Sequence, residues 1–435
     1  MLTFRAIRVY VFSVLLICLA SRQAKAYSVL AHEAIIDASW KPVLYPMIKE
    51  KYPNATREEM IKAHSYAYGG SIVADMGYMP LGNAFFTDLL HYVRSGDFII
   101  NLINDAQNIN EYAFALGALS HYMADKYGHS MSTNLNVPLV YPKLQKKFGN
   151  VVTYEENHMS HSRMEFAYDV LQIGQGGYTS EGYHDFIGFN ISVPVLERAF
   201  YKTYGRNLNT IFGNIDADIN TMRWGVRNLF PKLTKAAYES NKDQISKLNP
   251  GITAKEFQYK MTRRAFNLEF GKQRQEPKFW AKAAVFLIGI LPKVGPLKAL
   301  KFKSPGEEGQ KLFAQSFDAI LKNYHAALAE VQTNSLVLPD INFDTGEPTQ
   351  LGNYHLADNT YAKLLEKLQE QGYKTVSPDL QKNIVEYFAK ADTSRINNLK
   401  NSDKKKWLQT AERVSEISNL KTMPRDSVRS LATEN

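Results

Sequence analysis

Hydrophobic residues recur at intervals of three and four along most of the chain, which is the period of α-helices that bury one face. Residues 111–127 and 158–173 show this spacing most clearly, and residues 209–330 show it again. Glycine clusters, such as the pair at 69–70, mark loops between the helical segments. Two-residue alternation, which is typical of β-strands, is scarce. The pattern therefore predicts an all-α protein.

The same pattern divides the chain into two regions behind its first 26 residues. Residues 27–200, with an outer limit near 240, read as one helical domain. Residues 209–435 read as a mainly helical C-terminal region whose role the sequence does not indicate. A loop at 333–357, rich in Asn, Asp, Gly, Pro and Thr, interrupts that region. An apolar run at 280–300 contains two prolines and is interpreted as a buried helix with a turn, in preference to a segment that touches lipid.

The first 26 residues have the composition of a cleaved export signal. They carry four basic and no acidic residues around an apolar stretch from Val9 to Ala20, which is too short to cross a bilayer. The tripeptide Ala-Lys-Ala at 24–26 then supplies the small-x-small pattern of a signal-peptidase site. We therefore expect the mature chain to begin at Tyr27 and the protein to be periplasmic or secreted.

Removal of this segment changes both the charge and the available chemistry. The whole chain has 52 Lys and Arg against 43 Asp and Glu, a net charge of +9 that suggests an anionic partner. Without the four basic residues of the signal, 48 remain and the net charge falls to +5. The single cysteine, Cys18, is lost as well. A chain without thiols excludes disulfides, cysteine nucleophiles and thiolate zinc sites.

The histidines are concentrated in one part of the chain, because seven of the ten lie between positions 32 and 161. Histidines clustered with carboxylates are the usual trace of a metal site, although a single histidine on a helix is more often an ordinary polar residue. His121 with Asp125, and His161 with Glu165, are spaced by four residues, so each pair shares one helix face. His129 continues the first stripe about 12 Å along the axis from His121. Asp125 therefore lies between two histidines that cannot easily share an ion, which indicates a site for several metals.

Several familiar signatures are absent. His32-Glu33 is not followed by the second histidine of a zinc-protease motif, and no nucleophile elbow or phosphate-binding loop occurs. Residues 340–346 resemble a calcium loop, but the glycine is one position late and position 12 is not Glu, so we interpret them as a turn-rich loop. His64 and His158 are assigned to positions beside the ligands or at the surface.

The order of the candidate residues resembles the zinc-dependent phospholipase C family, which includes secreted bacterial phospholipases C. The fungal single-strand-specific zinc nucleases share its fold. The resemblance covers about residues 27–170. Its elements are an N-terminal aromatic residue and a nearby histidine (Tyr27, His32), a loop aspartate (Asp75), a histidine (His91), a His-x-x-x-Asp helix with a further histidine (His121, Asp125, His129) and a His-x-x-x-Glu pair (His161, Glu165). Each element is weak alone, and their order behind a predicted cleavage site makes the match specific.

The resemblance implies a helical enzyme with three zinc ions. By analogy, the first ion is bound by Asp75, His91, His121 and Asp125, the second by His129, His161 and Glu165, and the third by His32, Asp125 and the α-amino and carbonyl groups of Tyr27. Asp75 is also expected to orient or deprotonate the attacking water. The α-amino group is a ligand only if cleavage occurs directly before Tyr27, so the export prediction and the metal prediction depend on each other.

The implied reaction is hydrolysis of a phosphodiester, with a phospholipid as the expected substrate and transient contact with a membrane surface. Two alternatives stay open: a single-strand nuclease of the same fold, and a non-catalytic binding protein that metal only stabilises. The net charge of +5 is modest, and no basic stripe beside aromatic residues occurs in the metal-bearing half, which disfavours the nuclease. Two features depart from the usual pattern: Tyr27 stands where Trp is common, and three residues separate Asp125 from His129, a spacing that resembles the glycosylphosphatidylinositol-specific phospholipase D branch.

Overall fold

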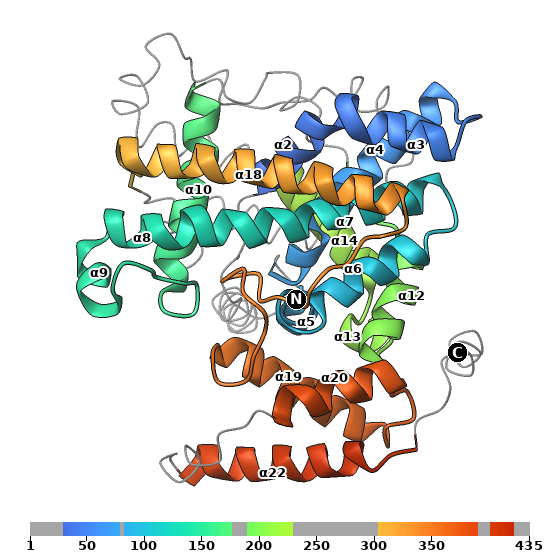
Figure 1. Ribbon diagram of the computed structural model, residues 1–435, viewed down its shortest axis with the longest axis vertical. Helices are drawn as coiled ribbons and strands as arrows, with labels where there is room; N and C mark the ends of the chain where they lie inside the picture. The colour runs from blue at the N-terminus through green and yellow to red at the C-terminus, as the bar shows by residue number, and fades with distance from the viewer. Residues whose placement is uncertain (1–28, 79–81, 176–188, 229–302, 390–400, 422–435) are drawn as a thin grey trace, which may run out of the picture.

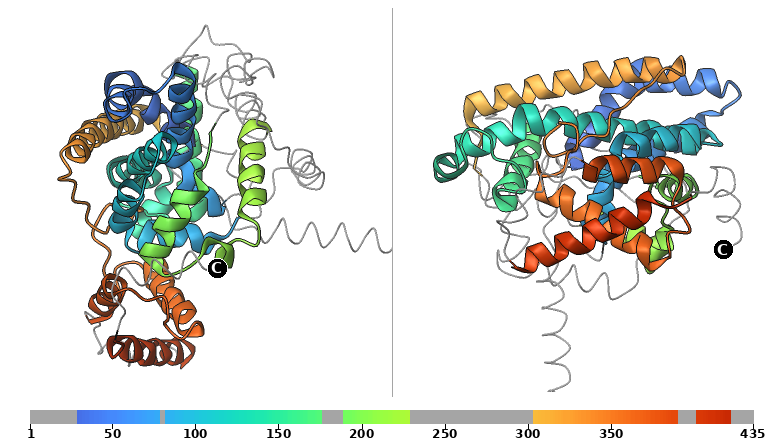
Figure 2. Two further views of the ribbon diagram at one scale, coloured as in Figure 1. Left: turned by 90° about the vertical axis from the view of Figure 1, so that its right-hand side faces the viewer. Right: turned by 60° about the horizontal axis from the view of Figure 1, so that its bottom comes forward.

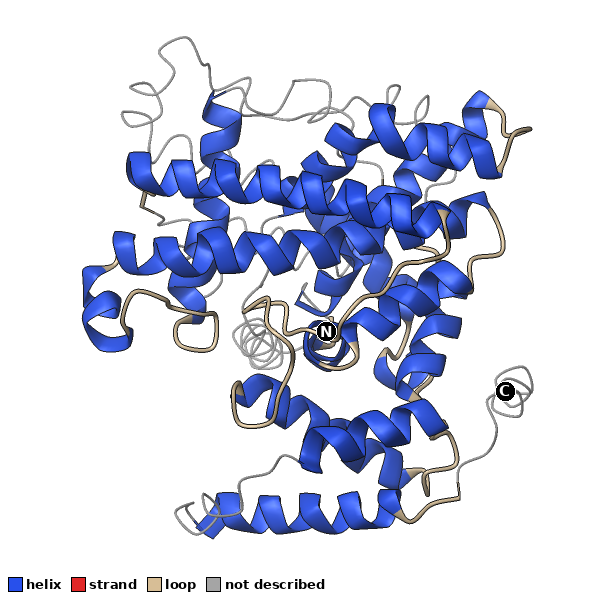
Figure 3. Ribbon diagram, viewed as in Figure 1, coloured by secondary structure: helices blue, strands red, loops and turns tan. Residues whose placement is uncertain are grey.

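The computed structural model describes residues 29–78, 82–175, 189–228, 303–389 and 401–421. Every regular element in these ranges is a helix (Figure 3), apart from an isolated bridge between Ile341 and Pro348. The predicted all-α class is confirmed. Within the same ranges, no helix combines the length and the apolar character that a membrane crossing requires. The expected export signal, Tyr27 and the apolar run at 280–300 lie outside the described residues.

The helices before residue 230 include those that carry the candidate ligands. In chain order they are α2 (Val29–Ser39), the π-helix η1 (Trp40–Leu44), α3 (Tyr45–Lys51), α4 (Arg57–Ile72), the 3-10 helix η2 (Val73–Tyr78), α5 (Ala84–Tyr92), α6 (Ser95–Asn104), α7 (Ile109–Gly128), the π-helix η3 (His129–Thr133), α8 (Asn134–Val140), α9 (Pro142–Phe148), α10 (His158–Gln175), α12 (Val193–Tyr204), α13 (Leu208–Ile211) and α14 (Ile215–Asn228). The expected helices at 111–127 and 158–173 correspond to α7 and α10 and are confirmed.

The C-terminal region contributes α18 (Gly306–Gln332), α19 (His355–Glu370), α20 (Pro378–Ala389) and α22 (Asn401–Ser418). Helix α18 runs beside α7, whereas α19, α20 and α22 gather at the opposite end from α3 and α4 (Figures 1 and 2). The hydroxyl of Tyr324 on α18 donates a hydrogen bond to the carbonyl oxygen of Leu116 on α7 at 2.9 Å. The C-terminal region therefore packs directly on the helices that precede residue 200, and the division of the chain near 200–209 stays a prediction.

Helix α7 is the centre of the packing. Its residues are buried almost without interruption from Glu111 to Asp125. Helices α4, α6, α18 and α2 surround it. A helix that is covered on all sides carries apolar residues all round, and the sequence Phe-Ala-Leu-Gly-Ala-Leu at 114–119 has this character. The polar residues that α7 does bury, above all His121 and Asp125, are therefore exceptional and must find partners in the interior.

Gly69 and Gly70 lie inside α4, so the prediction of a loop at this glycine pair is wrong. Two glycines, Gly70 on α4 and Gly117 on α7, instead let these helices approach each other closely. A Cβ atom on Gly117 would lie 2.0 Å from the carbonyl oxygen of Ala67, and one on Gly70 would lie 1.9 Å from that of Phe114. No side chain larger than hydrogen can occupy either position without separating the helices. The close crossing brings the carbonyl oxygen of Ser71 within 2.8 Å of Nδ1 of His121, one turn beyond Gly117.

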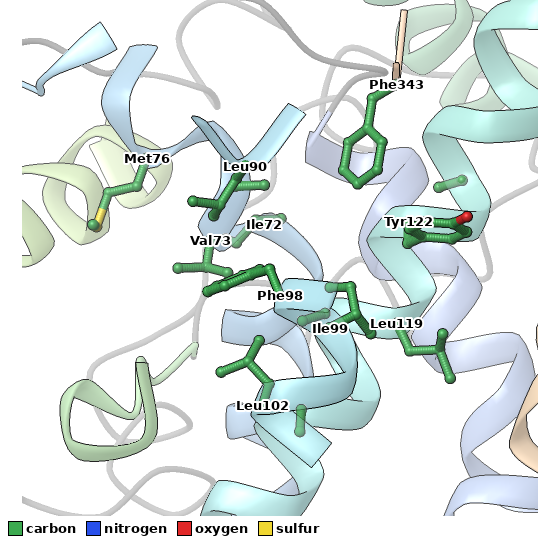
Figure 4. Packing of buried hydrophobic residues seen from close by; sticks show 14 of the residues in the cluster. Ile72, Val73, Met76, Leu90, Phe98, Ile99, Leu102, Leu119, Tyr122 and Phe343 are labelled. Carbon is green, nitrogen blue, oxygen red and sulfur yellow. The ribbon is translucent and has the colours of Figure 1, made fainter. Parts of the chain in front are cut away.

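The loop between α18 and α19, which the sequence predicts at 333–357, is held against the N-terminal helices. The Asp340 carboxylate accepts hydrogen bonds from the backbone N–H groups of Gly96 and Asp97 at the start of α6, at 3.0 and 3.1 Å. The Tyr122 hydroxyl on α7 donates to the carbonyl oxygen of Pro339 at 2.8 Å. These contacts fix the next residues, including Phe343, which lies beside Tyr122 and close to the apolar side chains of η2, α5 and α6 (Figure 4).

Candidate metal centre

Eight of the nine candidate ligands lie in the described part of the chain, and all eight are buried, with 0–2% of their surface exposed. They come from six elements. His32 lies on α2, Asp75 on η2, His91 on α5, His121 and Asp125 on α7, His129 on η3, and His161 and Glu165 on α10. The ninth, Tyr27, is outside the described residues. Buried ionisable groups at this density are stable only if their charges are compensated, by one another or by a bound metal ion.

Asp125 occupies the middle of the cluster. Its Oδ2 atom lies 3.2 Å from Nε2 of His121 and 3.4 Å from Nε2 of His91. Its Oδ1 atom lies 3.5 Å from Nε2 of His32. Burial alone would raise the pKa of Asp125, but His121 and His129 outweigh it and hold the pKa well below its usual range. Asp125 is therefore an ionised carboxylate that faces histidines from both of its oxygens.

Asp75 lies close to two of the same histidines. Its Oδ1 atom is 3.5 Å from Nε2 of His91, and its Oδ2 atom is 3.9 Å from Nε2 of His32. Two sets of three residues have ligand atoms that all lie within 4.8 Å of one another: His32 with His121 and Asp125, and Asp75 with His91 and His121. The rings of His32 and His121 stack with centroids 4.4 Å apart. His121 thus belongs to both sets, although the resemblance assigned it to one ion alone.

A second cluster forms around Glu165. Its Oε1 atom lies 3.2 Å from Nε2 of His129 and 3.2 Å from Nδ1 of His161. Burial raises the pKa of Glu165 to about 8, against the opposing effect of His129. Nε2 of His129 is also 3.9 Å from Oδ1 of Asp125, which connects the two clusters. The residues that the resemblance assigned to separate ions are therefore neighbours in one continuous polar centre.

His129 lies where the helix type changes, and its own N–H still donates to the carbonyl oxygen of Asp125 as in an α-helix. Helix α7 ends at Gly128, and η3 continues it as a π-helix, whose wider turn rotates side chains relative to a regular α-helix. The sequence pattern treated His129 as a continuation of the α-helical stripe through His121 and Asp125. The structure places it one turn beyond Asp125, with Nε2 toward Glu165 on α10. Short π-helical turns of this kind are frequent at functional sites.

The distances in the cluster suit zinc better than direct hydrogen bonds. Two ligands held at about 2.0–2.1 Å from a tetrahedral zinc ion lie about 3.3 Å apart, whereas charge-assisted hydrogen bonds are about 2.7–2.9 Å long. Most of the histidine–carboxylate separations here are 3.2–3.5 Å. The carboxylate oxygens of Asp75 and Asp125, Oε1 of Glu165 and Nε2 of His121 are buried and make no hydrogen bond. A set of ligand atoms made up only of histidine nitrogens and carboxylate oxygens fits zinc.

In three of the histidines, the ring nitrogen that faces away from the cluster is held by a hydrogen bond. Nδ1 of His91 donates to the carbonyl oxygen of Thr87 at 2.9 Å, and Nδ1 of His121 donates to that of Ser71 at 2.8 Å. Because a carbonyl oxygen can only accept, both rings must present a lone pair on Nε2, toward the cluster. Nε2 of His161 lies 3.0 Å from Oδ1 of Asn134, which leaves Nδ1 for the cluster. The second contacts of these rings thus select the tautomers that a metal needs.

Two residues that the sequence did not assign to the site lie against it. The ring of Phe343 packs on His91 and His121, with centroids 5.2 and 5.7 Å apart. Oδ1 of Asp344 lies 3.7 Å from Nδ1 of His129. Both come from the loop at 340–346. Its run of Asp and Asn was the one signal in the sequence that could have suggested a binding site there. More than 200 residues separate this loop from His129, so no local pattern could connect them.

The remaining described histidines have contacts of another kind. His64 stacks on Trp40 at 3.9 Å, and its Nε2 lies 3.4 Å from Asp37. His158 is exposed at the start of α10, beside the ring of Tyr154. His325 pairs with the hydroxyl of Ser39 at 3.0 Å, and His355 is exposed at the start of α19. His184 lies outside the described residues.

Comparison with protein families gives one result that bears on this centre. Residues 31–212 match the family model described as zinc dependent phospholipase C. The resemblance seen in the sequence is therefore confirmed over this segment, which contains all eight described ligand candidates and spans less than half of the 435 residues. Neither the curated proteins nor the solved structures gave a match.

Proposed function

We propose that this chain is an exported zinc-dependent phosphodiester hydrolase of the phospholipase C type. The observation that carries the proposal is the buried centre itself. Carboxylates of Asp75, Asp125 and Glu165 lie 3.2–3.9 Å from five histidine nitrogens, inside the segment that matches the family model. A buried polar cluster of this size has no structural purpose that apolar packing would not serve at lower cost.

We assign the ligands as the family resemblance implies, and the short distances between the described side chains support this assignment. Asp75, His91 and His121 would hold one ion together with Asp125, and His129, His161 and Glu165 would hold a second. His32 and Asp125 would hold a third with the α-amino and carbonyl groups of Tyr27, provided that the export signal is cleaved directly before Tyr27. Asp125, with both oxygens facing histidines, is placed to bridge neighbouring ions.

The chemistry needs a nucleophile and a means of stabilising charge on phosphorus. When bound, zinc lowers the pKa of a coordinated water toward neutrality and neutralises phosphoryl oxygens. Asp75 would orient or deprotonate the attacking water, because its carboxylate lies within 3.5–3.9 Å of His91 and His32 in the buried centre. The buried positions of all three carboxylates exclude bulk water and strengthen these electrostatic interactions.

The family match favours a phospholipid as the substrate, with transient contact between the protein and a membrane surface. The products would be a diacylglycerol and a phosphorylated head group. Residues 27–200 would form the catalytic domain. The C-terminal region at 209–435 would complete the fold around it, because α18 covers α7 and the loop that follows reaches the histidines.

Metal analysis combined with substrate assays tests the proposal. The purified mature protein should contain close to three zinc ions per chain and should hydrolyse phosphatidylcholine. Asp125→Asn should lose both zinc and turnover, because it removes the charge that faces His32, His91 and His121. His158→Gln is the matched control, since it changes an exposed histidine on the helix that carries His161 and Glu165.

Three other outcomes would assign the protein differently. Release of nucleotides from single-stranded DNA or RNA, with phosphatidylcholine untouched, would identify a nuclease. Bound zinc without turnover of phosphatidylcholine, a water-soluble phosphodiester or single-stranded DNA would identify a protein that metal only stabilises. Full zinc content and activity in Asp125→Asn would show that Asp125 is not the bridging ligand.

A further inference from the structure

We propose that Asp344, which lies outside the segment matched by the family model, is a positioning residue of the metal centre. In this role it accepts a hydrogen bond from Nδ1 of His129 and so keeps Nε2 available for metal. The inference rests on the metal centre proposed above and extends it to the loop at 340–346, which begins 128 residues beyond the end of the matched segment.

The two nitrogens of the His129 ring face two different carboxylates. Nε2 lies 3.2 Å from Oε1 of Glu165, on the side of the ligand cluster. Nδ1 lies 3.7 Å from Oδ1 of Asp344, on the other side of the ring. This second separation exceeds a hydrogen bond, and the atoms must approach by about 0.8 Å to form one of about 2.9 Å. Histidines that bind metal usually donate their other N–H to such an acceptor, which fixes the tautomer and the ring orientation.

The Asp344 carboxylate is itself held in one orientation. Its Oδ2 atom accepts hydrogen bonds from the hydroxyls of Tyr92 at 2.7 Å and Tyr354 at 2.5 Å. Tyr92 ends α5, directly after His91, and Tyr354 immediately precedes α19. With two donors on Oδ2, the other oxygen is directed toward His129. Asp344 is buried, so this arrangement is not exchanged with solvent.

The backbone around Asp344 contacts the other histidines as well. Its carbonyl oxygen accepts a hydrogen bond from Nδ2 of Asn134 at 2.7 Å, which turns Oδ1 of Asn134 toward Nε2 of His161. The N–H of Phe343 donates to the carbonyl oxygen of His91 at 3.1 Å, and the Phe343 ring packs on His91 and His121. One short turn therefore contacts four candidate ligands, directly or through Asn134. A loop that only covers the core would not need these contacts.

A purely structural role for Asp344, as an acceptor for two tyrosines, makes a different prediction from a positioning role. Asp344→Asn can keep both tyrosine hydrogen bonds through its amide oxygen. The amide nitrogen then faces Nδ1 of His129 and donates a proton toward it. That contact favours the tautomer with its proton on Nε2, which cannot bind metal through this atom. The substitution therefore preserves the tyrosine contacts while disfavouring the His129 tautomer that carries its proton on Nδ1 and can bind metal through Nε2.

The test measures zinc affinity by competition with a chelator in the full mature protein. Asp344→Asn should weaken binding of one zinc ion about 10- to 100-fold. Asp340→Asn is the matched control, because Asp340 is a half-buried carboxylate of the same loop whose contacts are to the start of α6 and to Asn383, not to a histidine. The amide oxygen of Asn can still accept the two backbone hydrogen bonds that hold the loop. The control should bind zinc within about threefold of the wild type. Cobalt substitution adds a spectroscopic readout, since the visible absorption of the affected site should change in Asp344→Asn and not in Asp340→Asn.

A measurement on the wild type keeps the inference testable if Asp344→Asn fails to fold. Nitrogen-15 labelling of histidine in the zinc-loaded protein should show a slowly exchanging, downfield Nδ1 proton on His129. Absence of that proton, or unchanged zinc affinity and cobalt spectrum in a folded Asp344→Asn variant, would overturn the inference and leave the proposed function standing. A wild type that binds no zinc at all would instead overturn the proposed function.

Discussion

Gly117→Ala separates two effects that act in opposite directions. In the interior of a helix, Ala is favoured over Gly by about 1 kcal/mol, so helix propensity alone predicts a more stable protein. In the structure, the new Cβ atom would lie 2.0 Å from the carbonyl oxygen of Ala67 on α4. The neighbouring atoms are backbone, which cannot rotate away, so α4 and α7 must move apart by about 1 Å or more to restore ordinary contact distances.

The expected net result is destabilisation. Overpacking of this kind typically costs about 1–3 kcal/mol and occasionally more, and the contact here is with backbone at the centre of the fold. Because the contact is with backbone, we expect a cost in the upper part of this range, about 2–3 kcal/mol. After subtracting about 1 kcal/mol for helix propensity, the free energy of unfolding should fall by about 1–2 kcal/mol. The separation would also stretch the 2.8 Å hydrogen bond between Nδ1 of His121 and the carbonyl oxygen of Ser71, so zinc affinity should fall with stability.

Urea unfolding of the wild type and the variant measures the change. Gly213→Ala is the matched control, because a Cβ atom there meets nothing within 4 Å and the residue does not have a positive φ. The control should be unchanged or stabilised by a few tenths of a kcal/mol. If Gly117→Ala unfolds at the same urea concentration as the wild type, or at a higher one, α4 and α7 do not cross as closely as the 2.0 Å between this Cβ position and the carbonyl oxygen of Ala67 implies.

Three further predictions concern the centre and the loop beside it. Burial raises the pKa of Glu165 to about 8, so zinc must displace a proton from this carboxyl group when it binds. Zinc affinity, measured by competition with a chelator, should therefore rise between pH 6 and pH 8. A flat profile would exclude Glu165 as a ligand. Phe343→Ala should lower the free energy of unfolding by about 3–5 kcal/mol, because it empties the space beside His91 and His121, and a loss below about 1 kcal/mol would contradict this packing. Burial and Asp97 raise the pKa of Asp340 to about 6. Between about pH 4 and pH 6 the folded state therefore binds more protons than the unfolded state, so the free energy of unfolding falls as the pH rises through that window. Asp340→Asn removes this effect and should gain up to about 3 kcal/mol over the wild type between pH 4.5 and pH 7 in urea unfolding; an equal difference at both values would refute the shift.

The sequence by itself determined the all-α class, the two helices α7 and α10, and the pairs of ligand candidates that lie within each of them. The spacing of His121 and Asp125, and of His161 and Glu165, follows from the rise and period of a helix, and both pairs lie 3.2 Å apart in the structure. The order of His32, Asp75 and His91 before them was informative only through resemblance to a known family. Their approach to one another depends on packing, which the glycines at the α4–α7 crossing make possible.

Only the tertiary structure decided what lies behind the histidines. Asp344 and Phe343 belong to a loop that resembles an incomplete calcium motif in the sequence, and nothing in its pattern relates it to residues more than 200 positions earlier. Its place is set by hydrogen bonds from Gly96, Asp97 and Tyr122 to Asp340 and Pro339. Spacing along one helix is a property of the local backbone, so the sequence reveals it. The partner of a ring nitrogen across the interior depends on how distant segments pack, and this is settled only when the whole chain folds.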